Sequence, residues 1–383
     1  MKARVLYLND THNVPGGAEY QVTQLVKAVQ GAGGEALVAC IPGSRTEADF
    51  QAAGVATVPL ASLRSNPLAA VRKIKRICRE RSIDIIHTAS FLTNYAGRRA
   101  AKALGLPAVT TVHCEPDSIL LAKPGLLVHA ELLARSSIDI TKHTAMFIAV
   151  SNAVAAKLIA RGVPERKVTV ISNGIDGDRV RRAAVEGETI DAQRGPGELL
   201  IGAMARLDAV KALDVLVKAV ALLVQRGFNA KAVIIGEGDE RPALDKLVAE
   251  LGVADRVIFT GYLENPYPQL AAVDIYVVSS HSEGQNLTVL VAMALALPVV
   301  ATAVGGIVDM VADERSGLLV PPRDPQALAV AIERLAGDEG LRRRLVEGGG
   351  EVLTGFTTAE MCRRTLDVYE RLLSLSPDVN RQE

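Results

Sequence analysis

Two cations in this sequence have the spacing of a phosphate-binding pair. Arg206 directly follows an apolar stretch over 199–205, and Lys211 comes five residues later, before a stretch of helical period. Where a strand gives way to a helix, such a pair suits a diphosphate, because arginine engages it through two donors and lysine acts as a point charge. The alternative interpretation is a pair of solvated surface cations.

The densest group of polar residues is segment 279–288, which lies between an apolar strand candidate and an apolar helix candidate. On a glycine-containing loop at the end of a strand, the carboxylate of Glu283 can accept hydrogen bonds from sugar hydroxyls. The next backbone amides begin the helix and are predicted to face a phosphate. They belong to Gln285, Asn286, Leu287 and Thr288. The alternative is that Glu283 is an ordinary acid in the first turn of that helix.

A glycine pair opens a helix near the N-terminus. The strand candidate 4–9 leads into a loop with Gly16 and Gly17, where the backbone can approach an anion and helix amides can donate to it. An ordinary tight turn is the alternative. A dinucleotide site would need G-x-G-x-x-G here, and the partial match at 236–238 lacks the third glycine, so the sequence does not predict NAD binding.

Alternating strands and helices must position these residues. Apolar runs predict strands, and segments of helical period lie between them, for example 18–30 and 215–226. The predicted strands are 4–9, 36–41, 83–87, 108–113, 146–150, 168–171, 199–205, 231–235, 256–260, 274–278 and 298–301. Continuous apolar strands alternating with helices indicate an α/β protein whose parallel sheets are covered on both faces.

A polar segment divides the two series of strands and helices. We predict an N-terminal Rossmann-like domain over 1–178, a linker over 179–197 and a C-terminal Rossmann-like domain over 198–355. Two doubly wound domains in tandem would hold a ligand in a cleft between them, at the carboxyl ends of the strands.

The formal net charge is zero, but its distribution is uneven. Residues 1–180 carry 22 Lys and Arg against 14 Asp and Glu, while residues 181–383 carry 21 against 29. A neutral total argues against a nucleic-acid binder. The basic half still permits contact with phosphate or anionic lipid, especially through the cationic stretch 72–81, although such a stretch is usually a solvated face.

Cysteine use and hydropathy predict a cytoplasmic protein. Peripheral contact with the inner face of the membrane is a second expectation. The four cysteines form no CxxC pair, which indicates free thiols in a reducing compartment. No apolar run reaches the roughly 18–20 residues that span a bilayer, and the N-terminus lacks the pattern of a secretory signal.

The ordered set of motifs resembles the family-four retaining glycosyltransferases of the GT-B fold, and the resemblance covers most of the chain. It rests on Gly16-Gly17-Ala18-Glu19, Asp84-Ile-Ile-His87, Thr111-Val-His113, Ala149-Val-Ser151, Asn173-Gly174-Ile-Asp176, Arg206 with Lys211, Gly236-Glu-Gly238, Phe259-Thr-Gly261, Ser280 to Gly284, Pro298-Val-Val, Gly305-Gly306 and Gly317-Leu-Leu-Val.

The resemblance implies a transferase that moves a hexosyl unit from a nucleotide-diphosphate sugar to a glycan or lipid-linked acceptor, as in cell-envelope polysaccharide synthesis. Arg206 and Lys211 would stabilise the diphosphate as it leaves, and Glu283 would contact the donor sugar. His113 takes the family's catalytic-histidine position. Gly16 and Gly17 would close over the phosphate or the acceptor, and Gly261 is counted with the donor-binding residues. The resemblance implies no metal and no cofactor, and it implies that the C-terminal helix within 356–383 packs back on the first domain.

The sequence departs from the family pattern at four positions. Val291 replaces the second of two glutamates, whose carboxylate normally accepts the ribose hydroxyls, and valine accepts no hydrogen bond. If the cleft is open to water, so that the new carboxylate is not buried unpaired, a glutamate there should tighten nucleotide binding. Ala212 and Ala296 replace the family's usual glycines, and Ser279 replaces a proline. A non-catalytic GT-B binding or partner subunit is therefore the alternative function, and an epimerase or phosphorylase is a more distant one.

Overall fold

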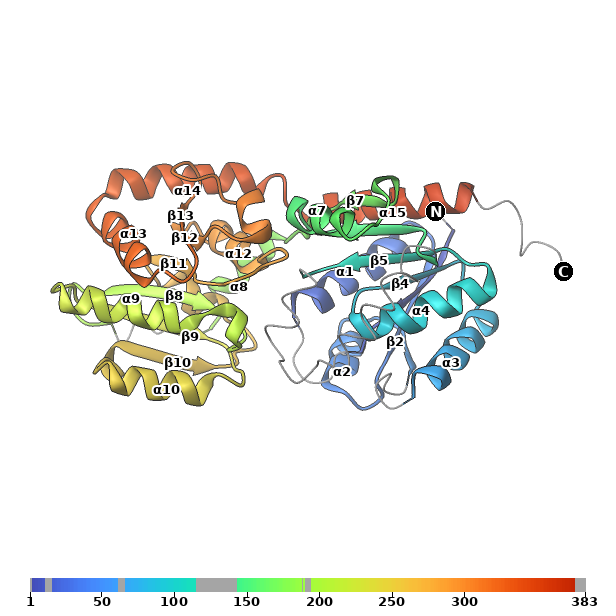
Figure 1. The fold of residues 1–383 in the computed structure, drawn as a ribbon, viewed down its shortest axis with the longest axis horizontal. Helices are drawn as coiled ribbons and strands as arrows, with labels where there is room; N and C mark the ends of the chain where they lie inside the picture. The colour runs from blue at the N-terminus through green and yellow to red at the C-terminus, as the bar shows by residue number, and fades with distance from the viewer. Residues whose placement is uncertain are drawn as a thin grey trace. The chain divides into compact units, whose positions relative to one another are not determined.

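The computed structural model describes residues 2–10, 16–60, 66–114, 143–187, 189 and 194–375. These residues form two compact units (Figure 1). Unit 1 contains the described residues up to Gly174 and those from Thr358 onward, while unit 2 contains Ile175–Thr357. Each unit is an α/β domain built on its own parallel sheet.

The sheet of unit 1 has the strand order β3-β2-β1-β4-β5-β6-β7, and every neighbouring pair is parallel. Its strands are β1 (Arg4–Leu8), β2 (Glu35–Cys40), β3 (Thr57–Pro59), β4 (Ile85–Thr88), β5 (Ala108–Val112), β6 (Met146–Ala149) and β7 (Val168–Val170). The helices are α1 (Gly17–Gly31), α2 (Arg45–Ala52), α3 (Pro67–Glu80), α4 (Phe91–Leu104), α7 (Asn152–Ala160), the short η2 (Glu165–Lys167) and α15 (Thr358–Ser374).

Alternate residues of β1 show how helices cover the two faces of this sheet. Val5 and Tyr7 belong to an apolar cluster with side chains of α1 and α15, whereas Leu6 and Leu8 belong to one with α3 and α4. This is the period of two expected for a strand buried on both faces. The carboxyl ends of β1, β4 and β5 are thereby placed side by side under α1 and α15.

The sheet of unit 2 has the strand order β10-β9-β8-β11-β12-β13, again all parallel. The strands are β8 (Leu199–Met204), β9 (Ala230–Ile235), β10 (Val257–Gly261), β11 (Ile275–Val278), β12 (Val299–Thr302) and β13 (Leu318–Val320). The helices are α8 (Gly177–Ala184), η4 (Ala209–Lys211), α9 (Leu213–Gln225), α10 (Arg241–Glu250), η5 (Ala254–Arg256), α11 (Tyr267–Ala271), α12 (Leu287–Ala294), η6 (Gly305–Asp309), α13 (Pro325–Gly337) and α14 (Glu339–Leu353).

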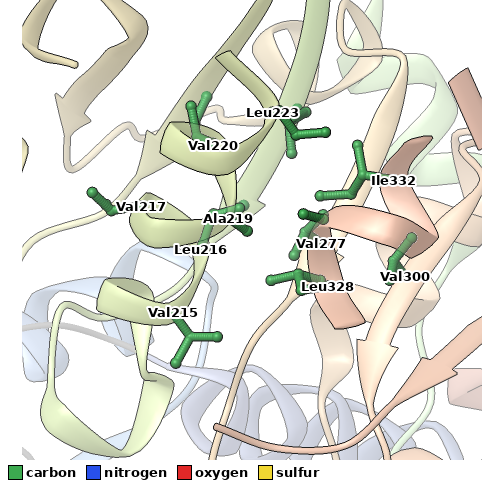
Figure 2. Close-up of a cluster of buried hydrophobic side chains, with 14 of the residues drawn as sticks. Val215, Leu216, Val217, Ala219, Val220, Leu223, Val277, Val300, Leu328 and Ile332 are labelled. Atoms are coloured by element: carbon green, nitrogen blue, oxygen red, sulfur yellow. The ribbon is translucent and has the colours of Figure 1, made fainter. Parts of the chain in front are cut away.

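The core of unit 2 lies between helices and the central strands. Figure 2 shows α9 side chains facing those of β11, β12 and α13. The labelled residues are Val215, Leu216, Val217, Ala219, Val220, Leu223, Val277, Val300, Leu328 and Ile332. The order of strands reverses between β8 and β11, so the carboxyl ends of these two strands form the switch point at which doubly wound sheets bind ligands.

The predicted α/β class with two parallel sheets is confirmed. Every strand predicted from the sequence is present within one or two residues, while β3 and β13 were missed. Helix α8 occupies the start of the segment expected to be a linker, and its Val180 packs in a core cluster of unit 2. Helix α15 belongs to unit 1, where it contacts α1. No helix among the described residues is long and apolar enough to cross a membrane.

Candidate active site

A lysine–glutamate pair lies at the switch point of unit 2. Lys211 ends the short helix η4 after β8, and Glu283 stands on the loop after β11. The Lys211 Nζ donates to Glu283 Oε1 over 2.7 Å, and the two side chains are 22% and 7% exposed. Because parallel strands end at one edge of a sheet, residues 72 positions apart in sequence meet here.

The same carboxylate oxygen accepts two further hydrogen bonds. Ser280 Oγ donates to Glu283 Oε1 over 2.7 Å, and Asn286 Nδ2 donates to it over 2.9 Å. No described residue donates to Oε2 of this carboxylate. Glu283 is thus held rigidly by one oxygen, which leaves the other to accept a hydrogen bond from a ligand hydroxyl.

Backbone contacts fix the loop that carries Glu283. The Gly306 amide donates to the Glu283 carbonyl over 3.1 Å, and Gly305 has a φ of +48°. A Cβ on Gly305 would lie 1.7 Å from that same carbonyl oxygen, so only glycine permits this approach. The motif Gly305-Gly306 was visible in the sequence, but its role in holding Glu283 depends on contact with a distant segment.

Arg206 is the most accessible cation of the site. Its side chain is 69% exposed, and it pairs with the neighbouring Asp208, with 2.7 Å from Nε to Oδ2 and 2.5 Å from a terminal nitrogen to the same oxygen. The other oxygen of Asp208 is buried and accepts no hydrogen bond from the described residues. Asp208, which the sequence analysis did not single out, therefore orients the guanidinium while leaving part of it open to an anion.

The first turn of α12 is only partly available to a phosphate. Asn286 caps the helix, and its Oδ1 accepts from the Thr288 amide over 3.0 Å and from the Thr288 hydroxyl over 2.6 Å. The hydroxyl of buried Tyr276 donates to Thr288 Oγ1 over 2.5 Å, and burial raises the pKa of this tyrosine. Thr288 is thus occupied within the protein. This corrects the expectation that its amide faces a phosphate.

A small cavity lies beside these groups. Lys211, Ser280 and Asn286 line it together with Tyr276 and the ends of β8 and β11. Gly261, at the end of β10, does not line this cavity. Its φ of +74° explains why glycine stands there.

Val291 lies in α12 with its side chain in an apolar cluster, and the residue is only 6% exposed. The expectation for a glutamate at position 291 required a carboxylate that is not buried, whereas the position itself is buried. A carboxylate at this position would lie in an apolar cluster rather than in solvent.

In unit 1 the glycine loop is tied down by Glu19. Its Oε2 accepts from the Gly16 amide over 2.8 Å, and its Oε1 accepts from Asn9 Nδ2 over 3.0 Å. Gly16 caps α1, and Gly17 is its first residue. Glu19 belongs to the motif quoted above, but the sequence did not reveal that it bridges the loop to the end of β1.

His113 directly follows β5 in unit 1. Burial lowers its pKa to about 4, and the negative charge of nearby Glu19 opposes that shift only in part. The imidazole is therefore neutral at neutral pH. His113, Gly16 and Gly17 belong to unit 1, whereas Arg206, Lys211 and Glu283 belong to unit 2.

Within the part of the chain that the structure describes, no group of three or more His, Cys, Asp or Glu side chains could hold a metal ion. The four cysteines are free thiols, of which only Cys114 is exposed.

Known proteins share both halves of this architecture. A family model described as Glycosyltransferase Family 4 matches residues 15–179, and one described as Glycosyl transferases group 1 matches residues 198–338. A D-inositol 3-phosphate glycosyltransferase of Frankia alni is 32% identical over 327 residues, covering 76% of this chain and 75% of that protein. The chain belongs to glycosyltransferase family 4. The predicted family is confirmed.

Two further relatives extend the match over almost the whole chain. The lipopolysaccharide core biosynthesis glycosyltransferase LpsE of Rhizobium meliloti is 28% identical, covering 94% of this chain and 97% of that protein. The crystal structure of HepE from Anabaena in complex with UDP has a TM-score of 0.82 at 21% identity, covering 97% of this chain and 100% of that chain. These matches confirm the GT-B fold, and family membership favours a transferase over a non-catalytic subunit.

Proposed function

We propose that this family-4 glycosyltransferase transfers a hexosyl unit from a nucleotide-diphosphate sugar with retention of configuration and without a metal ion. The observation that carries the proposal is the convergence of Lys211, Ser280 and Asn286 on one oxygen of Glu283, with the exposed Arg206 five residues before Lys211, after the end of the same strand β8. A fixed carboxylate next to two cations suits a ligand that joins a hydroxyl-rich sugar to a diphosphate.

In this proposal the cations act on the leaving group. Negative charge grows on the diphosphate as the glycosidic bond breaks, and preorganised cations stabilise this charge more in the transition state than in the ground state. Arg206 has donors beyond those paired with Asp208, and Lys211 has two N–H groups beyond the one given to Glu283. The free Oε2 of Glu283 would accept a hydroxyl of the donor sugar and orient it.

We propose uridine diphosphate sugars as the first donors to test, because HepE was solved with UDP. The proposed acceptor is a glycan or lipid-linked glycan of the cell envelope, which the likeness to LpsE supports. His113 is proposed to lie beside the transferring sugar.

The test is release of nucleoside diphosphate from a panel of UDP-, GDP- and ADP-sugars with envelope glycan acceptors. Arg206→Ala should lower transfer by about 10²–10³, the size expected for losing one preorganised charge. Arg226→Ala is the matched control, since Arg226 pairs with Glu333 outside the site. Product anomeric configuration by NMR tests retention, and unchanged rates in EDTA test metal independence. Equal rates for Arg206→Ala and wild type would remove this arginine from the mechanism.

Peripheral membrane contact is proposed through α3. Its exposed face carries Arg72, Arg76 and Arg79, and Leu68 near its start is 60% exposed. Such a face suits anionic headgroups, with about 1 kcal/mol per cation near the surface. Co-sedimentation should rise with the anionic lipid content of vesicles and fall with salt. Equal sedimentation with neutral vesicles would leave α3 as a solvated face.

A further inference from the structure

A chain of buried hydrogen bonds connects the C-terminal helix to the strand that leads to His113. Tyr369 of α15 lies 3.0 Å from Tyr7 by their hydroxyl oxygens, and its hydroxyl is hydrogen-bonded to His87 Nδ1. The other ring nitrogen, His87 Nε2, lies 2.8 Å from Thr111 Oγ1. All four side chains are buried. Thr111 lies in β5, and His113 directly follows that strand.

The direction of this chain follows from counting hydrogens. Burial lowers the pKa of His87 to about 3, so its ring is neutral and carries one N–H. The only described partner of the buried Tyr7 hydroxyl is Tyr369, so Tyr7 must donate to it or leave a buried hydrogen unpaired. Tyr369 then donates to His87 Nδ1, and His87 Nε2 donates to Thr111.

This assignment leaves the Thr111 hydroxyl hydrogen without an acceptor inside the chain of bonds. Thr111 lines a cavity of about 20 Å³ together with Gln21 of α1 and His113. The side-chain amide nitrogen of Gln21 donates to the Gly174 carbonyl over 2.9 Å. Its Oε1 is buried and accepts from no described group. A donor and an acceptor thus face one cavity that has room for about one water molecule.

We propose that this cavity is a binding site for one ordered water, which accepts from Thr111 and donates to Gln21 Oε1 and to a ring nitrogen of His113. The three bonds are the usual number for a buried water. No described residue hydrogen-bonds the His113 ring, whose neutral form has one acceptor nitrogen. The water fixes that tautomer and the ring orientation, which makes Tyr369 a positioning residue that acts through His87 and Thr111.

The proposal rests on the proposed function only for the role of His113 in transfer. Its first test needs no substrate. A high-resolution crystal structure should show one water within hydrogen-bond distance of Thr111 Oγ1 and Gln21 Oε1, and the near-isosteric Thr111→Val should lose it. A cavity without water in the wild type, or the same water in Thr111→Val, would overturn the proposal.

The second test follows the His113 ring itself. In ¹⁵N NMR, the wild type should show one neutral tautomer of His113, whereas Tyr369→Phe should show a mixture, because His87 can then accept from Thr111 and withdraw the hydrogen from the water. Val368→Ala is the matched control, because it removes buried volume from the same helix without removing a member of the hydrogen-bond chain. It should keep the single tautomer, and a mixture there as well would reduce Tyr369 to a packing role.

Kinetics then separate the water site from the role of His113 in transfer. Tyr369→Phe and Thr111→Val should lower kcat about tenfold with donor KM unchanged, since misplacing one group costs rate rather than ground-state binding. Val368→Ala should leave both constants near wild type. Loss of the water and of the single tautomer with unchanged kcat would contradict the role of His113 in transfer and leave the water site standing.

Discussion

The hydrogen-bond chain of unit 1 is neutral and buried, whereas the contacts at the switch point of unit 2 are charged and partly open. Tyr7, His87 and Tyr369 are linked by hydrogen bonds and carry no net charge. Lys211 and Glu283 form an ion pair, and the exposed Arg206 stands five residues before Lys211 in the sequence. A neutral network of buried hydrogen bonds fixes geometry at little electrostatic cost, while a pair of charges at a surface can exchange partners with an anionic ligand. Unit 1 is therefore built to position groups and unit 2 to bind charge.

The largest expected effect comes from placing a charge in the apolar layer of unit 2 instead of at its edge. Val291→Glu should lower the free energy of unfolding by about 3–5 kcal/mol, because it buries a carboxylate in the apolar cluster that holds Val291. Val330→Glu is the control, since Val330 is exposed on α13 and should tolerate the change. Urea denaturation of the two variants measures the difference. A Val291→Glu protein as stable as wild type would mean that this position reaches water.

Removing the charge at the edge tests the other side of the comparison. Lys211→Ala should lower transfer by about 10²–10³, because it removes a donor from Glu283 and, in the proposed mechanism, a cation from the diphosphate. Lys246→Ala removes a surface cation of α10 that pairs with Glu250, and its transfer rate should stay near wild type. Initial rates at saturating and limiting donor separate kcat from KM. Equal losses in both variants would indicate a general charge effect.

The neutral hydrogen-bond chain of unit 1 should stabilise the fold less as the pH falls. His87 is neutral in the folded state with a pKa of about 3, against an ordinary value of about 6.5 in the unfolded chain. The unfolded state therefore binds more protons between these pH values. The contribution of His87 to the stability of the folded state is complete above pH 6.5 and declines as the pH falls toward 3. Between pH 7 and pH 5 the loss is about 2 kcal/mol for this one group.

Hydrogen exchange resolved by peptide measures this loss in each unit separately. Amides of β4 and β5 should lose protection between pH 7 and pH 5, after correction for intrinsic rates. His87→Gln removes one of two titrating rings and should about halve that pH dependence, because buried His113, whose pKa is lowered to about 4, contributes over the same pH range. A variant with the wild-type slope would assign the acid sensitivity to another group.

Local patterns predicted most of the fold and the charged site, but they missed contacts made across long stretches of sequence. Three residues show little of the strand period: of the three-residue edge strands, β7 was predicted, whereas β3 and β13 were missed. Arg206, Lys211 and Glu283 were found because their types and flanking elements are local signals. The roles of Glu19, Gly305 and Tyr369 depend on partners that no local pattern identifies, such as the pairing of Tyr369 with Tyr7, 362 residues away.

The Val291 position illustrates the same limit. Its side-chain type was read correctly as unable to accept a hydrogen bond, but its burial depends on how α12 packs in unit 2. Sequence alone could not decide whether an acid there would meet water or apolar side chains.

The smallest expected effect concerns the two alanines that replace the family's usual glycines, both of which lie in the left-handed region of backbone conformation. Ala212 and Ala296, which stand where the family usually has glycine, have φ values of +48° and +57°. The left-handed region costs an alanine about 1–2 kcal/mol, and glycine gives back part of that gain through the greater freedom of the unfolded chain. Ala212→Gly and Ala296→Gly should therefore each raise the free energy of unfolding by about 0.5–1 kcal/mol.

The control for these glycines is Ala219→Gly, in the interior of α9, which should destabilise by about 1 kcal/mol, because the helix there needs no left-handed residue. Since Ala212 immediately follows Lys211, Ala212→Gly also tests whether strain beside the ion pair matters to transfer. If kcat falls while stability rises, the strained alanine holds Lys211 toward Glu283. If both stay at the wild-type level, the left-handed conformation at this position costs the fold little and the comparison between a rigid unit 1 and a charged unit 2 stands without it.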